Sequence, residues 1–166
     1  MKITLLTHSK EINKKSNTGR LVLEVLGEAA QQVRWDRMHP PEELLREIAG
    51  GGVALVYPGP AGEEPGELGD IEHFILIDGT WHEARHIHQR SPYLHTIRRV
   101  ALRPVARSRY NLRKNQKEAG LCTAETVVEL LRATGYGQQA DLLEERFLAY
   151  MRPEAAMGRN VCEVCE

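Results

Sequence analysis

The sequence predicts an α/β fold: a single domain with a mostly parallel sheet and helices on both faces. Residues 53–57 and 74–77 are uninterrupted apolar runs, which are typical of strands buried on both faces of a parallel sheet. These runs alternate with segments that carry helical spacing and helix-capping residues. The chain has 166 residues, which is enough for one domain with a sizeable core.

Local signals predict the elements at the start of the chain. Residues 2–7 are rich in Ile, Leu and Thr and predict a first strand. Asn17 and Thr18 are helix-capping residue types that precede an apolar run with helical spacing, so we expect a helix over 20–26. A short second strand is expected over 31–35.

Proline and glycine mark the next elements. Two prolines and two glutamates open a helix over 40–48, because proline suits the first helical turn and acidic residues suit its positive end. Three glycines at 50–52 stop this helix. The apolar strand 53–57 follows, and after a loop rich in Gly, Glu and Pro the strand 74–77 ends at Asp78.

The second half of the chain continues the alternation. Its expected elements are a helix over 80–89, a strand over 97–102, a basic loop over 104–117, and helices over 124–133 and 138–150. We expect residues 1–152 to form the domain and residues 153–166 to form a C-terminal tail.

Charge is distributed unevenly along a chain whose formal net charge is −1. From Arg85 to Lys117 there are ten Lys and Arg residues and no Asp or Glu. This block indicates a surface that binds a polyanion such as RNA, although a solvated basic surface is the simpler alternative.

The composition and the first residues also predict where in the cell the protein is found. No apolar run approaches the roughly 20 residues that cross a bilayer, and the first eight residues are too few and too polar for a signal peptide. Three cysteines do not form a disulfide framework, so we expect a reducing cytoplasm and no membrane association. The sequence does not decide the oligomeric state, and a monomer is slightly favoured.

Three loops at strand ends or directly after a strand are candidates for a binding cleft. In doubly wound sheets, ligands bind beyond the carboxyl ends of the strands. The loops here carry Asn17-Thr18-Gly19-Arg20, Tyr57-Pro58-Gly59-Pro60 and Asp78-Gly79-Thr80-Trp81. Turn formation alone would explain any one of them, but together they predict a pocket at one edge of the sheet.

Residues 82–86 match H-E-x-x-H, the helix signature of zinc hydrolases, in which His82 and His86 bind zinc and Glu83 is the base. At 100° per residue, one helical stripe faces away from these histidines. That stripe contains Trp81, Ala84, Ile87 and His88. If it packs on the sheet, both histidines face solvent, so we do not expect a metal site here.

Two further motifs have a structural and a chemical interpretation. Asp78, at a buried strand end, can either cap the helix at Trp81 or accept a proton from a substrate. Cys162 and Cys165 form a lone C-x-x-C near the end of the sequence, and with Cys122 they are too few for a four-ligand zinc site without a histidine or a second chain. A tail with two thiols is the favoured interpretation.

Six ordered blocks of this sequence resemble the DTW-domain family, over about residues 5–131. They are Asn17-Thr18-Gly19-Arg20-Leu21, Tyr57-Pro58-Gly59, Asp78-Gly79-Thr80-Trp81 with Ala84 and Arg85, Ser91-Pro92-Tyr93-Leu94, Ser108-Arg109-Tyr110-Asn111-Leu112-Arg113 and Leu121-Cys122-Thr123-Ala124-Glu125. The resemblance implies a tRNA-uridine aminocarboxypropyltransferase. Such an enzyme moves the 3-amino-3-carboxypropyl group of S-adenosylmethionine to N3 of a uridine and leaves methylthioadenosine. It also implies a SPOUT-like fold with a deep C-terminal trefoil knot that holds the cofactor.

The resemblance assigns roles to individual residues. Asp78 would be the general base, or the group that orients the uridine, and Trp81 and Ala84 would pack against the methionine part of the cofactor. The full implied cofactor-binding set is Thr18, Gly19, Tyr57, Pro58, Gly59, Trp81, Ala84, Leu102, Tyr110, Leu121 and Thr123. The implied RNA-binding set is Arg20, Arg85, Arg98, Arg99, Arg107, Arg113 and Lys114, of which Arg20 could instead bind the cofactor carboxylate.

Three other functions remain open at this point: a SPOUT-like RNA methyltransferase with the same cofactor, the zinc hydrolase, and an RNA-binding module without catalysis. Some bacterial relatives carry an N-terminal cysteine cluster, whereas this sequence starts at the first expected strand. Because Cys162 and Cys165 are not in that position, we do not transfer metal binding to them. The sequence does not identify the uridine, or decide between tRNA and ribosomal RNA.

Overall fold

The computed structural model describes residues 1–59, 66–103 and 121–152. Within this part of the chain, five parallel strands form one sheet in the order β2-β1-β4-β3-β5. The strands are β1 (Lys2–Thr7), β2 (Ala30–Arg34), β3 (Val53–Val56), β4 (His73–Asp78) and β5 (Arg98–Val100). The helices are α1 (Gly19–Leu26), α2 (Glu42–Gly50), α3 (Trp81–Arg90), α4 (Thr123–Ala133) and α5 (Gly137–Tyr150), with short 3-10 turns η1 (Gly27–Ala29) and η2 (Pro92–His95).

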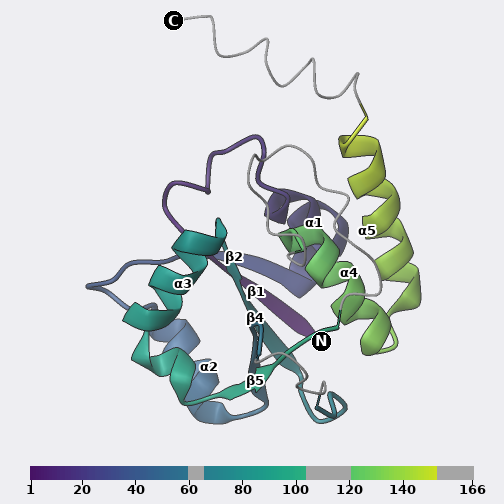
Figure 1. Ribbon diagram of the computed structural model, residues 1–166. Coiled ribbons are helices and arrows are strands. Elements are labelled where there is room, and N and C mark those ends of the chain that lie inside the picture. The colour runs from purple at the N-terminus through teal and green to yellow at the C-terminus, as the bar shows by residue number, and fades with distance from the viewer. Residues whose placement is uncertain (60–65, 104–120, 153–166) are drawn as a thin grey trace, which may run out of the picture.

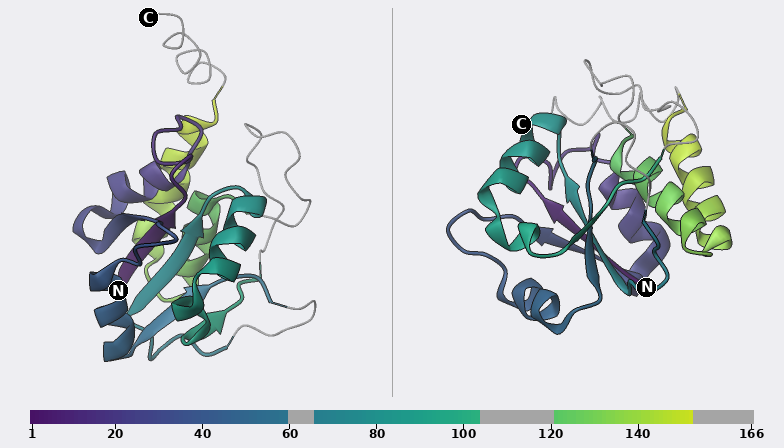
Figure 2. Two further views of the ribbon diagram at one scale, coloured as in Figure 1. Left: turned by 90° about the vertical axis from the view of Figure 1, so that its left-hand side faces the viewer. Right: turned by 60° about the horizontal axis from the view of Figure 1, so that its bottom comes forward.

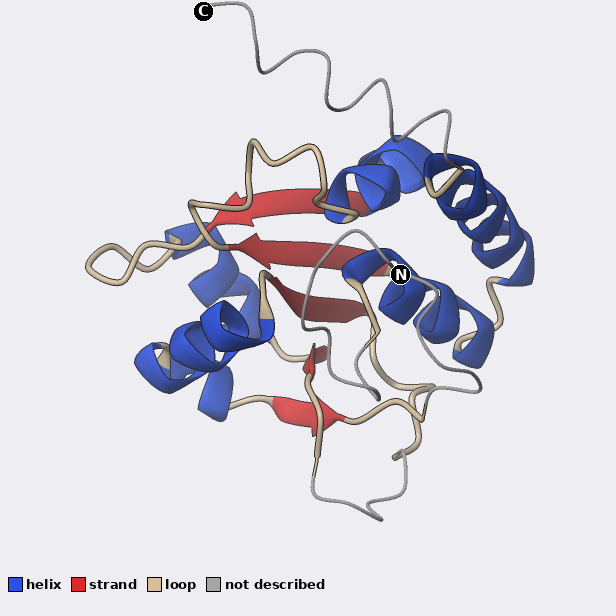
Figure 3. Cartoon of the chain, turned by 45° about the horizontal axis from the view of Figure 1, so that its top comes forward, coloured by secondary structure: helices blue, strands red, loops and turns tan. Residues whose placement is uncertain are grey.

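Helices cover both faces of the sheet (Figures 1 and 3). Because side chains alternate along a strand, Ile3 and Leu5 of β1 join the core under α1, α4 and α5, whereas Leu6 joins the core under α2 and α3. The right-hand view in Figure 2 shows α4 beside α5, on the side of the sheet away from α2. The predicted parallel α/β sheet with two covered faces is therefore confirmed.

Most predicted elements are present, and the differences lie at their ends. The strand expected over 97–102 is limited to Arg98–Val100. Trp35, expected in the second strand, lies just after it, where it is buried and donates its Nε1–H to Ser91 Oγ at 2.9 Å. The basic loop over 104–117 and the tail over 153–166 lie outside the described residues.

The strand order explains where a site can form. β1, β4 and β3 are neighbours and run in the same direction, so the loops that follow Thr7, Asp78 and Val56 leave from one edge of the sheet. This is the edge at which the sequence predicted a pocket. Among the described residues, no helix is long and apolar enough to cross a bilayer.

Candidate active site

The carboxylate of Asp78 joins three segments that are far apart in the sequence. Asp78 is 2% exposed and is the register partner of Thr7 on β1. Its Oδ2 accepts hydrogen bonds from Thr7 Oγ1 at 3.1 Å and from Asn17 Nδ2 at 2.8 Å, and its Oδ1 accepts one from Thr123 Oγ1 at 2.8 Å. Both oxygens therefore have partners, as buried polar atoms require.

The start of α1 packs tightly against this carboxylate. Asn17 Oδ1 accepts a hydrogen bond from Gly19 N at 2.6 Å, and Thr18 Oγ1 accepts one from Ala124 N at 3.1 Å, which ties α1 to the start of α4. A Cβ on Gly19 would lie 2.8 Å from Asn17 Oδ1 and 2.9 Å from Asp78 Oδ2. Glycine is therefore the residue that allows this approach.

Thr80 and Glu83 cap the N-terminus of α3. Thr80 Oγ1 accepts a hydrogen bond from Glu83 N at 3.2 Å, and Glu83 Oε2 accepts one from Thr80 N at 2.8 Å, which together form a capping box. Asp78, which we considered as a cap for Trp81, has no part in this arrangement. Its side chain faces Asn17 and Thr123 instead.

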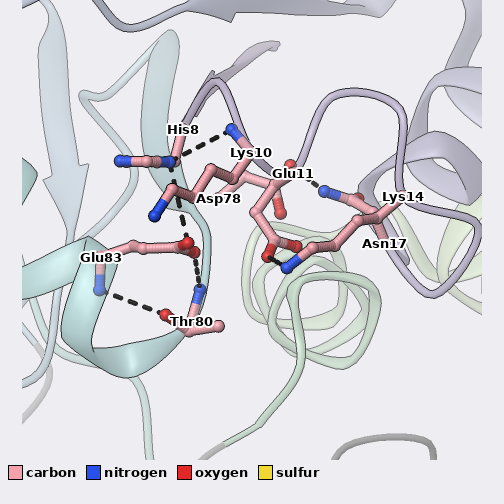
Figure 4. Close-up of polar contacts among 8 residues, drawn as sticks. All are labelled: His8, Lys10, Glu11, Lys14, Asn17, Asp78, Thr80 and Glu83. Carbon is pink, nitrogen blue, oxygen red and sulfur yellow. Dashed lines mark hydrogen bonds and ion pairs between the residues drawn. The ribbon is translucent and has the colours of Figure 1, made fainter.

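His8 follows β1 directly and lies beside the capping carboxylate (Figure 4). Its backbone N–H donates to Asp78 O at 3.1 Å, and its ring stacks on Trp35 with centroids 6.0 Å apart. Its Nδ1 lies 3.7 Å from Glu83 Oε1 and accepts a hydrogen bond from Lys10 N at 3.2 Å. Sequence reasoning assigned no role to His8, although a histidine directly after a strand is a usable signal.

The pKa of Glu83 is below its ordinary value. Burial acts to raise this pKa, but the hydrogen bonds from the backbone and side chain of Thr80 and the charges of His8 and Lys14 lower it by more. Glu83 is therefore an anion at neutral pH, and its side chain is 13% exposed. A negative charge at a helix N-terminus is also favoured by the helix dipole.

Aromatic rings continue along the same edge from the end of β3. The ring of Tyr57 stacks on His88 with centroids 4.2 Å apart and on Trp81 with centroids 6.1 Å apart. Burial raises the pKa of Tyr57, and the positive charge of Arg85 opposes that effect. Trp81 is 39% exposed, so part of this aromatic stack faces outward.

Comparison with known proteins places this site in a family. The sequence model of the DTW domain matches residues 1–153. The chain belongs to the DTW domain family. A Drosophila melanogaster protein named tRNA-uridine aminocarboxypropyltransferase 2 is 31% identical over 140 residues, which are 78% of this chain and 54% of that protein. The chain thus spans about half the length of this curated relative. No solved structure matches the chain significantly.

In this DTW domain, two parts of the prediction for the helix after Asp78 are wrong. Ala84 and Ile87 pack on the sheet as expected, but Trp81 does not, because at the first helical position it lies beyond the end of β4. His86 is half-buried rather than in solvent, since its ring contacts the edge of Trp35 with centroids 5.6 Å apart. His82 is exposed, as expected.

The H-E-x-x-H motif of this DTW domain has structural partners. Glu83, which would be the base of a zinc hydrolase, caps α3 and faces His8, while His86 packs on Trp35. Among residues 1–59, 66–103 and 121–152, no group of three His, Cys, Asp or Glu side chains could hold a metal ion. Cys162 and Cys165 lie outside these ranges.

The structure brings together only some of the DTW-domain residues implied for cofactor binding. Thr18, Gly19 and Thr123 meet around Asp78, and Tyr57 and Trp81 stack on each other. Leu102 packs against the core under α4, and Ala84 is one of the buried residues of α3. Pro58 and Gly59 continue the chain after Tyr57, Leu121 lies two residues before Thr123, and Tyr110 is outside the described residues.

The basic residues implied for RNA binding are also divided. Arg85 and Arg99 are exposed, and the guanidinium of Arg20 lies over the ring of Tyr150, 5.1 Å from its centroid. Arg98 instead holds the loop before β4, because it pairs with Asp70 at 3.1 Å and donates to the backbone oxygen of Glu67. Arg107, Arg113 and Lys114 lie outside the described residues.

Proposed function

We propose that this DTW domain transfers the 3-amino-3-carboxypropyl group of S-adenosylmethionine to N3 of a uridine in tRNA and releases methylthioadenosine. The observation that carries the proposal is the 31% identity to a protein named as a tRNA-uridine aminocarboxypropyltransferase, together with a family match that includes every site residue described above. The three loops at one edge of the parallel sheet support it, because such edges are where α/β folds bind ligands.

The residues present fit a sulfonium donor. Aromatic faces attract cations, and the exposed Trp81 stacked on Tyr57 offers such a face for the charged sulfur and its apolar neighbours. Leu102, Leu121 and Thr123 are proposed to contact the adenine, together with Tyr110. When bound, the donor supplies an electrophilic carbon. Because its sulfonium bears three such carbons, the choice of the carboxypropyl carbon depends on how the site positions the donor.

Asp78 is proposed to orient the site. Its oxygens accept hydrogen bonds from Thr7, Asn17 and Thr123, so it joins the end of β1, the loop before α1 and the start of α4. Thr18 and Gly19 are placed by the same network. Of the two roles implied by the family, base or orienting group, this geometry supports the second.

Arg85 of α3 and Arg99 of β5 are both exposed, and they are proposed to contact RNA phosphates. Arg20 is proposed to bind either RNA or the carboxylate of the donor. Contacts of this kind weaken steeply as salt concentration rises. A cytoplasmic location is proposed because the three cysteines do not form a disulfide framework. A SPOUT-like trefoil knot is also proposed; the all-parallel sheet supports that class.

Separate isotope labels test the reaction. The protein is incubated with bulk tRNA and S-adenosylmethionine that carries one label in the methyl group and another in the carboxypropyl carbons. We expect only the carboxypropyl label in the RNA, in nucleosides modified at N3 of uridine, with one methylthioadenosine released per transfer. Transfer of the methyl label alone would identify a methyltransferase, and transfer of neither label to tRNA or ribosomal RNA would contradict the proposal.

Two neighbouring variants provide the control. Trp81→Ala removes the exposed ring and should weaken donor binding about tenfold or more, since a cation–π contact in a desolvated site is worth roughly 2 kcal/mol. His82→Ala changes the next residue, which is exposed, and should leave donor binding and transfer unchanged. Equal effects of the two variants on donor affinity, measured by calorimetry, would remove Trp81 from the donor site.

A further inference from the structure

The loop between β1 and α1, residues 8–18, is basic on its outer surface. From Met1 to Leu23 the sequence has five Lys and Arg residues and a single acidic residue, Glu11. Lys10, Lys14 and Lys15 are exposed, whereas Glu11 is fully buried and its Oε1 accepts a hydrogen bond from Lys14 Nζ at 2.7 Å. The charged side chains that this loop exposes are therefore all positive.

The same loop has a fixed backbone. Three successive backbone hydrogen bonds of 2.8–3.2 Å close turns within residues 8–17. The hydroxyl of Tyr150, at the end of α5, donates to the backbone oxygen of Lys15, and the ring of Tyr150 lies under the guanidinium of Arg20. A surface that is already ordered loses less conformational freedom when it binds a partner, so the lysines are well placed for binding.

The loop borders the candidate site. The positive charge of Lys14 acts on the carboxylate of Glu83 at the start of α3, and Asn17, near the end of the loop, donates to Asp78. Figure 4 shows Lys10 and Lys14 on this loop beside these two carboxylates. An RNA that enters the site between the loop and α3 therefore passes the lysines.

We propose that Lys10, Lys14 and Lys15 bind phosphates of the RNA substrate, a role that rests on the proposed function. Arg85 follows β4 on α3, and Arg99 lies in β5, three strands from β1 in the sheet. The lysines therefore extend the cationic surface to the β1 side of the site. Because an ammonium group contacts phosphate without reading a base, these residues position the RNA and do not select its sequence.

The carboxylate of the donor is a second anion that a lysine could bind. It offers one negative charge, whereas the loop exposes three ammonium groups at residues 10, 14 and 15. A row of cations along an ordered loop matches a chain of phosphates better than it matches one carboxylate. The experiment nevertheless measures both ligands, so that the two sources are separated.

Lys10→Gln and Lys15→Gln, singly and together, test the proposal with tRNA as the ligand. Each single variant should weaken tRNA binding about fivefold to tenfold at about 0.1 M salt and lower the slope of log affinity against log salt by about one. The double variant should lower that slope by about two. The melting temperature and the affinity for S-adenosylmethionine should stay at the wild-type values. Lys14 is retained, because it pairs with the buried Glu11.

Two controls separate this surface from net charge. Arg46→Gln removes one positive charge from the exposed side of α2, a helix that ends at the amino edge of the sheet, just before β3. It should change tRNA affinity by less than about twofold and leave the salt slope unaltered. The double variant Lys10→Arg and Lys15→Arg keeps both charges and should bind tRNA like the wild-type protein. Equal losses in Arg46→Gln and Lys10→Gln would overturn the proposal.

Protection from acetylation locates the contact directly. Bound tRNA should slow the acetylation of Lys10 and Lys15 several-fold, as followed by mass spectrometry of the lysine-containing peptides. Lys2, which pairs with Glu47 at the amino edge, should react at the same rate with and without tRNA. Equal rates for all three lysines in the presence and absence of tRNA would show that RNA does not cover this loop.

The remaining outcomes distinguish the surface from the reaction. A weaker affinity for S-adenosylmethionine with an unchanged tRNA slope would assign the lysines to the donor and overturn their role in RNA binding. Label transfer by the wild-type protein, with tRNA binding unaltered in the double glutamine variant, would leave the proposed function standing and remove this surface. Absence of label transfer by the wild-type protein would defeat the proposed function, whereas the salt slopes would still decide whether these lysines bind RNA.

Discussion

Gly19 occupies a position where a side chain has no room. A Cβ there would lie within 3 Å of Asn17 Oδ1 and Asp78 Oδ2, and these atoms cannot move without breaking their hydrogen bonds. We expect Gly19→Ala to destabilise the protein by about 1–3 kcal/mol, as overpacking usually does, and to weaken donor binding. Urea denaturation and calorimetry with methylthioadenosine measure the two effects.

Gly50→Ala is the matched control for Gly19→Ala. Gly50 is the last residue of α2, and no atom lies within 4 Å of the position its Cβ would take. Alanine there should be neutral or should stabilise the protein by up to about 1 kcal/mol, because it reduces the freedom of the unfolded chain. Equal destabilisation by the two substitutions would show that the contacts around Gly19 are not the cause.

Cys122 is expected to be an inert thiol. Burial first, and then the negative charge of Glu125, raise the pKa of Cys122 to about 12. At pH 8 only about one molecule in ten thousand would carry the reactive thiolate, since each pKa unit is tenfold. Iodoacetamide should therefore modify Cys122 only after unfolding, as followed by mass spectrometry of the peptide that contains it. Rapid alkylation in the native protein would contradict this prediction.

At the scale of elements, α3 depends on its capping box. Thr80→Ala removes the hydroxyl that accepts from Glu83 N and should cost about 1 kcal/mol of unfolding free energy, the usual effect of losing an N-cap. Thr126→Ala is a suitable control, because its hydroxyl only adds a bond to the Cys122 carbonyl inside the first turn of α4. A Thr80→Ala protein as stable as wild type would show that the box contributes nothing.

Glu83 should make this stability depend on pH. Its folded-state pKa is depressed, so the unfolded chain binds the proton more readily on acidification. The stabilisation is therefore complete above the ordinary glutamate pKa and is lost as pH falls through the lower, folded value. Denaturation at a series of pH values should show the gap between wild type and Glu83→Gln closing in acid. A gap that is constant with pH would exclude this contribution.

The helices and strands could be predicted from sequence because their signals are local. The apolar runs of β3 and β4, the glycines after α2 and the residues before α1 each identify an element without reference to distant residues. The errors arose at the ends of elements. Trp81 falls on the helical stripe that was expected to pack on the sheet, but it lies past the end of β4 and is exposed. Periodicity predicts the direction in which a side chain points from the helix axis, but it does not predict where that side chain lies along a neighbouring strand.

The candidate site was only partly predictable, because it is formed by non-local contacts. Asp78, Thr18 and Thr123 could be selected from motifs, but nothing local shows that Thr123 donates to a carboxylate 45 residues away. The same holds for His8 and Glu83, whose proximity follows from the adjacency of β1 and β4. The glutamate of the H-E-x-x-H match, by contrast, has a local role, since Glu83 caps its own helix.

At the scale of the whole molecule, Asp78 links parts of the chain that no single element connects. It binds β1 through Thr7, the loop before α1 through Asn17, and the start of α4 through Thr123, so it lies where the sheet meets α1 and α4. Gly19 and Ala124 belong to the same network through Asn17 and Thr18. Such a buried polar network is stable only when every member has a partner.

Removing this carboxylate should therefore affect stability and donor binding together. Asp78→Ala removes the acceptor of the buried Asn17 amide and of the half-buried Thr123 hydroxyl, while the Thr7 hydroxyl keeps its hydrogen bond to Leu5 O, and each buried donor left without an acceptor costs about 1–3 kcal/mol. Asp78→Asn keeps the shape but faces these donors with an amide, and it should retain part of the stability. Asp70→Asn is the control, because its carboxylate is 78% exposed and its ion pair with Arg98 lies at the surface, so it should change stability by less than about 1 kcal/mol. Urea denaturation of the three variants, with methylthioadenosine binding measured on each, distinguishes a joining role for Asp78 from a purely chemical one. If Asp78→Ala unfolds at the wild-type urea concentration and only transfer is lost, the carboxylate acts in the chemistry and does not hold the site together.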